Sequence, residues 1–487
     1  MKKKNLQSGT LLVQVLVFAT IAIVVIGALI SWASVNIKAS RVALYREQAL
    51  QISEAGIDYY RWHLAHANND YKDGNATSTG PYVHDFFDKD GVKIGTFTLT
   101  ITPPSTGSTI VTIQSDGRVL VDPTVVRKIK VRLGIPSLAR FAMVTNSVVY
   151  YGAGDEVFGP IHSNSGVGFL TGSPNAIAHN LVTSALSTFN DGGASCAGTH
   201  FGVFSCISPA DPAPPAAVPN NPAVFQSGRT FPVPVVDFVG ITSDLASIKT
   251  NAQASGFYRA ASGGSGYKIV LKTNDTFDLY KVNSLLPAPG GCTNALSQAG
   301  WGTWSINTTG GATTLLGNYA FPANGLMFFE DHIWIEGQIN TARLTIGAGA
   351  FPVNPATYKN IIINNNLAYT NFNGTDAIGL IAQGNFLVGM ASADSLTIDG
   401  AIIAQNGQTI RYYYNNSCKN GGNNWYLRSA LTTYGMFASN GQGYFYYGSS
   451  GYQSQPATYD ANFLYGPPPS FPLTGNQYTI ISWQEVY

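Results

Sequence analysis

The densest group of side chains that could perform acid–base chemistry is Glu330-Asp331-His332, with Arg343 later in the chain. Clustered carboxylates, one acting as acid and one as base, are the groups that hydrolyse glycosidic bonds. Adjacent residues of a strand point to opposite faces, however, so Glu330 and Asp331 are not expected to act together. The chain also lacks the Gly-x-Ser-x-Gly, His-Glu-x-x-His and phosphate-loop motifs. We therefore predict that the protein is not an enzyme and needs no cofactor.

The four cysteines are Cys196, Cys206, Cys292 and Cys418. An even number of cysteines in an exported protein favours disulfides. Cys196 and Cys206 bracket a short loop and are the favoured pair, which leaves Cys292 with Cys418. A zinc site that includes His200 is the competing interpretation, but the chain has no Cys-x-x-Cys and its other histidines are scattered. The sequence therefore predicts two disulfides and no metal.

Two further groups could bind ligands. Asp85, Asp88 and Asp90 resemble the start of a calcium loop, but the later acidic ligand of an EF-hand is missing, so a hairpin turn is favoured. Exposed tryptophans and tyrosines could stack on sugars, although ordinary sheet packing explains them better. This aromatic set comprises Trp301, Trp304, Tyr412, Tyr413, Tyr414, Tyr444, Tyr446 and Tyr447.

The N-terminal segment decides on which side of a membrane all of these groups lie. Lys2, Lys3 and Lys4 precede an apolar stretch from Leu11 to Ala33. As a helix this stretch would be about 35 Å long, enough to cross a bilayer core of about 30 Å. Because lysine-rich flanks stay in the cytoplasm, the rest of the chain is expected outside it, as a single-pass membrane protein.

Three interpretations of this segment remain open: a signal anchor, a cleavable signal peptide ending near Ser31-Trp32-Ala33, and a type IV prepilin leader. The lysines, Ser8-Gly9 and the apolar stretch with its early polar Gln14 resemble the type IV pilin family. In that family a prepilin peptidase cuts after the glycine and the new amine is methylated. The resemblance implies a leader of residues 1–9 and a mature chain that starts at Thr10.

Two positions depart from the family pattern. The family usually has Phe first and Glu fifth, and here Thr10 and Gln14 stand there. Gln14 can donate and accept hydrogen bonds, but it cannot neutralise the amine of a neighbouring subunit. Relatives that lack the glutamate are typically minor or tip subunits, which is what the resemblance implies for this chain.

The residues after the apolar stretch predict that the helix continues to about residue 70. An apolar stripe recurs at spacings of three and four, and no proline interrupts the chain from Thr10 to Ala67. The stripe comprises Val42, Tyr45, Ala49, Ile52, Gly56, Tyr59 and His63. The segment SEAGIDYYRW also resembles the helix of PilX-like minor pilins.

Residues 71–135 alternate apolar and polar side chains between turn signals such as Asp88-Lys89-Asp90-Gly91. They predict three or four antiparallel strands with one face covered by the helix stripe. A long helix followed by a small antiparallel sheet is the order of a pilin head.

Residues 136–487 repeat short apolar runs separated by Gly and Asn, which supply backbone corners. We expect a large mainly-β exported domain, with a β-solenoid favoured and a β-sandwich as the alternative. Within it, residues 208–224 are proline-rich and predict an extended surface segment, whereas residues 238–260 predict a helix. The GPIHSN motif and the closing residues resemble a region attached to PilX-like N-termini.

The predicted fold class is therefore α+β. The net charge is +1 and no long basic run occurs, so no nucleic-acid partner is expected. We expect a minor or tip subunit of a type IV pilus or pseudopilus, held in the inner membrane before assembly and at the cell surface after it. Its partners would be other pilin subunits, the prepilin peptidase and a surface ligand such as a carbohydrate, with adhesion as the role. The alternative is an anchored carbohydrate-binding protein or polysaccharide-active enzyme.

Overall fold

The computed structural model describes residues 8–105, 108–193, 195–196, 198–475 and 477–486. The fold is α+β, with one long N-terminal helix and a large β-rich region. The chain divides into two compact units. Unit 1 comprises Met1–Pro103, Ile110–Gly134 and Gln477–Tyr487, and unit 2 comprises Pro104–Thr109 and Ile135–Asn476.

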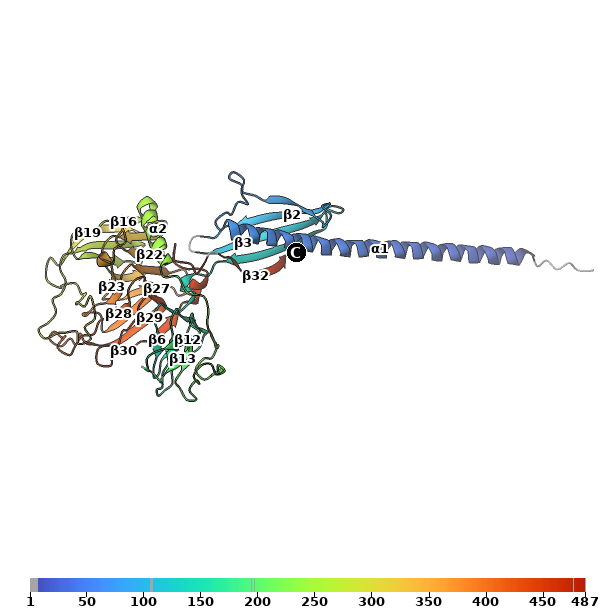
Figure 1. Ribbon diagram of the computed structural model, residues 1–487. Helices are drawn as coiled ribbons and strands as arrows, with labels where there is room; N and C mark the ends of the chain where they lie inside the picture. The colour runs from blue at the N-terminus through green and yellow to red at the C-terminus, as the bar shows by residue number, and fades with distance from the viewer. Residues whose placement is uncertain (1–7, 106–107, 194, 197, 476, 487) are drawn as a thin grey trace, which may run out of the picture. The chain divides into compact units, whose positions relative to one another are not determined.

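Helix α1 (Ser8–His66) is the long helix of unit 1 (Figure 1). It runs without a break because the segment contains no proline. It ends at His66, whose neighbour Ala67 donates its N–H to the carbonyl of His63. The prediction placed the end a few residues later, at residue 70.

A five-stranded antiparallel sheet completes unit 1, in the order β1-β2-β3-β4-β32. The first four strands follow one another along the chain, as the alternation predicts. The bounds are β1 (Tyr82–Phe87), β2 (Lys93–Thr102), β3 (Ile110–Val119), β4 (Val126–Gly134) and β32 (Thr479–Val486).

Strand β32 differs from the sequence analysis, which placed residues 136–487 in one domain. In the structure Trp483 pairs with Val131 and Thr479 with Gly134, so the last residues extend the sheet of unit 1. Unit 2 is therefore inserted between two neighbouring strands of one sheet. The alternation in β32 could not reveal this, because it shows only that a strand forms and not which strand it pairs with.

The second half of α1 covers one face of this sheet. Ile52, Tyr60 and Leu64 are buried against a layer that includes Leu99 and Ile113. Gly117 lets the helix come close, since a Cβ there would overlap the carbonyl of Ala49 and the backbone of Ser53. The Ser53 hydroxyl donates to the carbonyl of Ser115 at 2.6 Å and fixes the contact.

Unit 2 contains a long ladder of parallel strands, which we call the main ladder. A strand from the end of unit 2 pairs with a strand from the start of unit 2. The order of the strands in space therefore differs from their order along the chain. In spatial order it comprises β16 (Phe257–Arg259), β20 (Leu326–Phe329), β22 (Arg343–Ala348), β25 (Ala377–Ala382), β27 (Ser395–Ala404), β29 (Leu427–Ser439), β5 (Met143–Thr145), β8 (Ile161–Ser163), β11 (Val182–Ser184) and β15 (Arg229–Thr230).

Further strands pair beside the main ladder. A second parallel ladder comprises β17 (Gly266–Leu271), β21 (Ile333–Ile339), β23 (Ile361–Ile363), β26 (Phe386–Val388) and β28 (Thr409–Arg411), and β24 (Leu367–Tyr369) joins β21 to β27. The antiparallel strands β18 (Thr276–Val282) and β19 (Thr313–Ala320) extend β17, and β30 (Gly451–Ser454) and β31 (Ala457–Tyr459) pair with β29.

The remaining strands are short and lie between residues 149 and 205. They are the parallel set β6 (Val149–Tyr151), β9 (Val167–Phe169) and β14 (Val203–Ser205), the parallel pair β7 (Glu156–Val157) and β10 (Ile177–Ala178), and the antiparallel pair β12 (Thr188–Asn190) and β13 (Thr199–Phe201). Three 3-10 turns complete the fold: η1 (Leu138–Arg140), η2 (Pro355–Thr357) and η3 (Ala461–Leu464).

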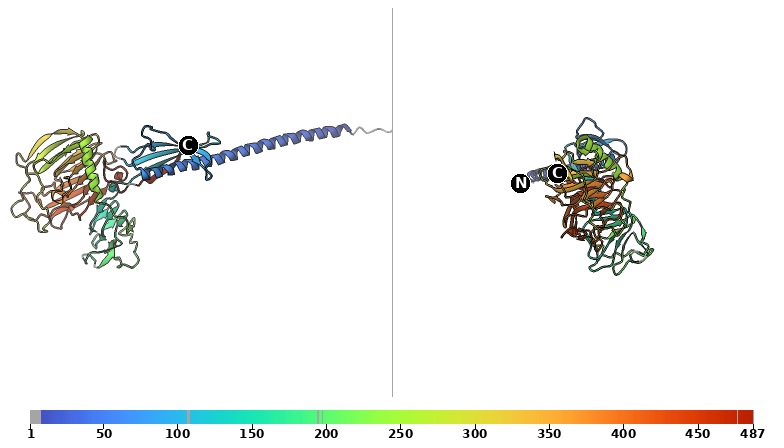
Figure 2. Two further views of the ribbon diagram at one scale, coloured as in Figure 1. Left: turned by 45° about the horizontal axis from the view of Figure 1, so that its top comes forward. Right: turned by 90° about the vertical axis from the view of Figure 1, so that its left-hand side faces the viewer.

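Helix α2 (Gly240–Ser255) lies beside the strands of unit 2, in green in Figure 2. It confirms the helix expected within residues 238–260. Leu245 and Ile248 are buried in the same core as Ile346, Leu380 and Ile402 of the main ladder. Burying this apolar stripe is what stabilises an otherwise polar helix.

The proline-rich segment 208–224 is anchored more firmly than the sequence analysis expected. Asp211 and Arg229 form an ion pair in which both side chains are almost fully buried. Arg229 also donates to the carbonyls of Val203 and Pro219. The segment is therefore held to β14 and β15 by one arginine.

Candidate functional site

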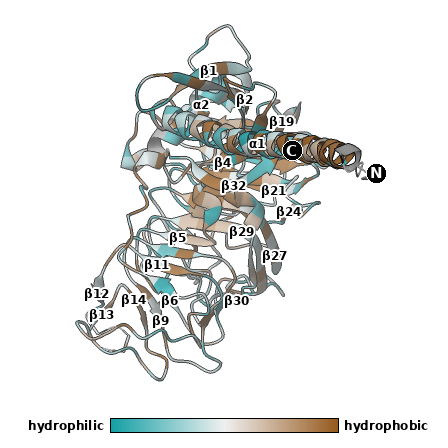
Figure 3. Cartoon of the chain, turned by 90° about the vertical axis from the view of Figure 1, so that its right-hand side faces the viewer, coloured by the Kyte–Doolittle hydropathy of each residue, from teal (hydrophilic) through white to brown (hydrophobic). Residues whose placement is uncertain are grey.

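The first half of α1 presents an exposed apolar surface. Every described side chain from Leu11 to Arg41 is exposed, and Figure 3 shows brown, apolar residues toward the N-terminal end of α1. Within the described residues α1 is the one helix long and apolar enough to cross a membrane. Gln14 is exposed on this surface. Thr20 satisfies its hydroxyl within the helix, by donating to the carbonyls of Leu16 and Val17.

The predicted processing site lies at the edge of the described chain. The backbone of Gly9 and Thr10 belongs to α1. The predicted leader charges Lys2, Lys3 and Lys4 lie outside the described residues. The roles of these five residues therefore stay predictions.

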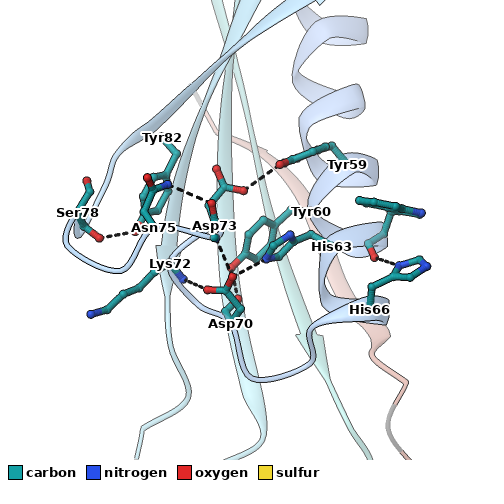
Figure 4. A network of polar contacts seen from close by, with 12 residues as sticks. Tyr59, Tyr60, His63, His66, Asp70, Lys72, Asp73, Asn75, Ser78 and Tyr82 are labelled. Atoms are coloured by element: carbon teal, nitrogen blue, oxygen red, sulfur yellow. Dashed lines mark hydrogen bonds and ion pairs between the residues drawn. The ribbon is translucent and has the colours of Figure 1, made fainter.

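The second half of α1 ends in a network of polar contacts with the loop that follows (Figure 4). Asp70 accepts from the N–H groups of Lys72 and Gly74 and contacts His63 Nε2 at 3.0 Å. These contacts hold the pKa of the Asp70 carboxyl below its usual range, with the Lys72 N–H as the largest cause. Asp73 contacts His84 Nε2 at 2.6 Å. The network closes the loop onto the helix and the sheet.

The side chains of the acidic group in unit 2 are all engaged in structural contacts. Glu330 forms an ion pair with Lys249 of α2. Asp331 accepts from the backbone and hydroxyl of Ser262 and lies 3.6 Å from Lys359. Arg343 donates to the carbonyls of Gly374, Gly466 and Pro467.

The histidine of that group is held neutral. His332 Nδ1 accepts the N–H of Asn360 at 3.0 Å. Burial, with the nearby Lys359 ammonium, lowers the pKa of His332 to about 4. The structure therefore does not bring Glu330, Asp331, His332 and Arg343 together around one point.

Both expected disulfides are present, Cys196–Cys206 and Cys292–Cys418. The residues of the proposed calcium turn are also accounted for: Asp88 Oδ1 accepts the N–H groups of Asp90 and Val92, and Asp85 pairs with Lys93. Among the described residues, no three His, Cys, Asp or Glu side chains lie close enough to hold a metal ion.

The aromatic set divides between core and surface. Tyr412 and Tyr414 are buried, and the indole N–H of Trp301 donates to the carbonyl of Tyr413. Tyr444 is exposed. Half of the set, Trp301, Trp304, Tyr412 and Tyr414, therefore packs around Cys292–Cys418 rather than presenting a flat platform for a sugar.

A ladder of asparagines follows the main ladder where β29, β5 and β8 end. Asn146 donates to Asn440 Oδ1 at 2.8 Å, and Asn164 donates to Asn146 Oδ1 at 2.9 Å. Asn164 then exchanges two hydrogen bonds with the backbone of Val236. This ladder was not predicted from the sequence, although each asparagine follows a Ser or Thr at the end of a short apolar run, in VTN, HSN and ASN.

Unit 2 also contains a partly open cavity of about 1050 Å³ that was not predicted from the sequence. Its lining includes Arg140 of η1, His162 of β8 and Asp244 of α2. His162 is buried, and its two ring nitrogens contact Thr183 Oγ1 and Asn164 Oδ1, both at 3.0 Å. Burial, with a smaller contribution from Arg140, lowers the pKa of His162, so the ring is neutral near pH 7.

Comparisons with known proteins give little further guidance. No protein-family model matches the chain, and no curated protein matches it by sequence. Among solved structures, the crystal structure of the competence-associated pilin ComZ from Thermus thermophilus is similar, at 12% identity over 91% of this chain and 98% of that chain, with a TM-score of 0.32. Because identity and TM-score are this low, function has to be argued from the chain itself.

Proposed function

We propose that the chain is a pilin-like subunit that is anchored in the membrane and then assembled through α1. The observation that carries this proposal is the division of α1 into two halves. Residues 11–41 are exposed and mostly apolar, whereas the residues around Ile52, Tyr60 and Leu64 are buried against the antiparallel sheet. A helix that only anchors a domain needs no such continuation into the core of that domain.

The apolar half has two successive environments in this proposal. It lies in the inner membrane first, because its length and composition suit a bilayer. On assembly it leaves the bilayer and packs against α1 helices of neighbouring subunits. Gln14 contributes hydrogen bonds there, but no charge, which favours a minor or tip position and a PilX-like subunit.

Unit 2 is, in this proposal, the displayed part of the subunit, and adhesion is its role. Its parallel pairing favours a β-solenoid over a β-sandwich, since sandwiches are built from antiparallel sheets. We also propose that it does not act as an enzyme, because Glu330, Asp331 and Arg343 are engaged in structural contacts.

Mass spectrometry of the mature N-terminus tests the proposal. We expect a chain that starts at a methylated Thr10. An intact Met1 would contradict processing by a prepilin peptidase, and a start at Ser34 would indicate ordinary secretion instead.

A matched pair of glycine variants sharpens this test. Gly9→Val should abolish cleavage, because the peptidase would require glycine at that position. Gly27→Val is the control, since Gly27 lies in the same helix and a Cβ added there would have no atom within 4 Å. Equal processing of both variants would argue against cleavage after Gly9.

A further inference from the structure

The cavity of unit 2 is bounded mostly by apolar side chains. Its lining includes Leu138, Phe141, Ile241 of α2 and residues 233–236 and 471–473. Leu181, Val235 and Leu473 leave 40%, 69% and 40% of their surfaces exposed. Exposed apolar residues beside a cavity with a few polar groups are typical of a binding site.

Arg140 supplies a cation to this cavity that forms no ion pair with the described residues. Its Nε is buried and has no hydrogen-bond partner, and no carboxylate of the described residues lies within 4.0 Å of its guanidinium. The guanidinium lies 4.6 Å from the centre of the Phe141 ring, which orients it. Because Nε has almost no accessible surface, an anionic ligand would bind the two terminal nitrogens, which make no hydrogen bond with the described residues.

The α2 side of the cavity supplies hydrogen-bond acceptors. Asp237 Oδ1 already accepts the N–H groups of Val239 and Gly240 at the start of α2. Asp244 has no hydrogen bond or ion pair among the described residues, and burial together with Asp237 raises the pKa of its carboxyl. Asn251 lies further along α2 and also lines the cavity. A ligand that satisfies this side must offer N–H donors.

We propose that this cavity binds the C-terminal carboxylate and the last aliphatic residues of a polypeptide. The carboxylate would pair with Arg140 through two parallel hydrogen bonds, which is the geometry that guanidinium favours. The peptide N–H groups would donate to Asp244 and Asn251, and the aliphatic side chains would contact Leu181, Val235 and Leu473. The proposal does not depend on filament assembly.

Two other ligand classes fit less well. A fatty acid offers the carboxylate and the apolar body, but it has no N–H to donate to Asp244. An acidic sugar offers the carboxylate, but the exposed part of the lining is aliphatic, whereas sugars favour exposed aromatic faces. The peptide terminus alone matches the cation, the acceptors and the apolar surface.

Calorimetry on the full chain in phospholipid nanodiscs tests the proposal, because detergent could itself enter an apolar cavity. The probes are N-acetyl-valyl-leucine and N-acetyl-valyl-leucinamide, which differ only in the C-terminal group, a carboxylate in the first and a neutral amide in the second. We expect the acid to bind at least tenfold more tightly than the amide. Equal affinities, or no binding of either probe, would overturn the proposal.

Variants locate the binding and identify the ligand class. Arg140→Gln should remove the preference for the acid, Arg140→Lys should retain part of it, and Asp244→Asn should weaken both probes. Arg132→Gln, at an exposed arginine of unit 1, should change neither affinity. If an Arg140 variant fails to fold, the unmodified chain provides another readout: binding of the dipeptide acid should slow amide exchange in residues 233–251. Octanoate or glucuronate binding as tightly as the dipeptide acid would overturn the assignment to a polypeptide terminus.

Discussion

The two units of this chain are both rich in strands, but their strands find partners by different routes. In unit 1, β1 to β4 pair in chain order across short turns, and only β32 arrives from far along the chain. In unit 2, β29 pairs with β5, so that Phe437 lies opposite Met143. Unit 1 therefore depends on local pairing and on one covering helix, whereas unit 2 depends on contacts between distant segments. Such contacts carry a large loop-closure entropy, so covalent links should matter most in unit 2.

The largest expected effect follows from the disulfides. Cys292–Cys418 spans 126 residues and Cys196–Cys206 spans 10. Replacing Cys292 and Cys418 by serine should lower the free energy of unfolding of unit 2 by about 5 kcal/mol. Replacing Cys196 and Cys206 by serine should lower it by about 3 kcal/mol. Both losses can be measured by urea unfolding that is monitored by amide hydrogen exchange in each unit. A larger loss for the Cys196–Cys206 variant would contradict the entropic argument, and unit 1 should not change in either case.

The next effect is confined to unit 1. Gly117→Ala should destabilise it by about 3 kcal/mol, because the new Cβ overlaps backbone atoms of Ala49 and Ser53, which cannot move aside. Gly290→Ala in unit 2 is the matched control, since no atom lies within 4 Å of its Cβ position. Faster amide exchange in β2, β3 and β4, with unit 2 unchanged, is the expected result. Loss of both units together would show that they unfold as one body.

A pH dependence distinguishes unit 2 from unit 1. Burial raises the pKa of Asp399 to about 6, although its carboxylate accepts the N–H of Tyr369, and nearby Asp460 adds to the rise. Because an unfolded Asp titrates near 3.9, the folded state binds more protons between about pH 4 and pH 6. Asp399 therefore lowers stability as pH rises through that window, by about 2 kcal/mol.

The Asp399→Asn variant isolates this contribution. His332 acts in the opposite direction, because its folded pKa of about 4 lies below that of an unfolded histidine, so it adds stability as pH rises from about 4 to 6.5. The stability of Asp399→Asn should therefore rise more steeply with pH than that of the unmodified chain. Asp275→Asn, at an exposed turn, is the control. Parallel pH curves for all three proteins would refute the assignment.

The smallest expected effect concerns β32, the strand of unit 1 that comes last in the chain. Tyr478, just before β32, donates to the carbonyl of Asn68 and accepts from Tyr71, both at 3.1 Å. Tyr478→Phe should cost unit 1 about 1 kcal/mol. Tyr413→Phe in unit 2 should cost less, because the Tyr413 hydroxyl makes no hydrogen bond among the described residues. Thermal unfolding monitored by amide exchange in each unit compares the two.

The contrast between the units also explains what the sequence could predict. The stripe through Ala49, Ile52 and Gly56 is periodic within one helix, so it predicted the buried face of α1. The two disulfides were predictable from cysteine number and spacing. The partner of β32 was not, because a strand's own residues specify a buried face and not a neighbour.

The candidate sites show the same limit. Asn146, Asn164 and Asn440 each follow a Ser or Thr at a strand end, a repeat that could have revealed their ladder. Arg140 and Asp244 carry no such signal, because they come from a 3-10 turn and a helix about a hundred residues apart. Their shared cavity exists only after the main ladder has formed.

The insertion of unit 2 between β4 and β32 has a mechanical consequence. Two peptide connections, after Gly134 and before Gln477, join the long segment Ile135–Asn476 of unit 2 to unit 1, in addition to those that flank Pro104–Thr109. Inside unit 2 the two chain ends remain paired, since Ser137 forms an antiparallel bridge with Leu473. A pull on unit 2 while α1 is held is therefore divided between two backbones, and each one bears part of the tension. A chain joined at both ends of such an insertion resists traction better than one whose second unit is attached through a single connection.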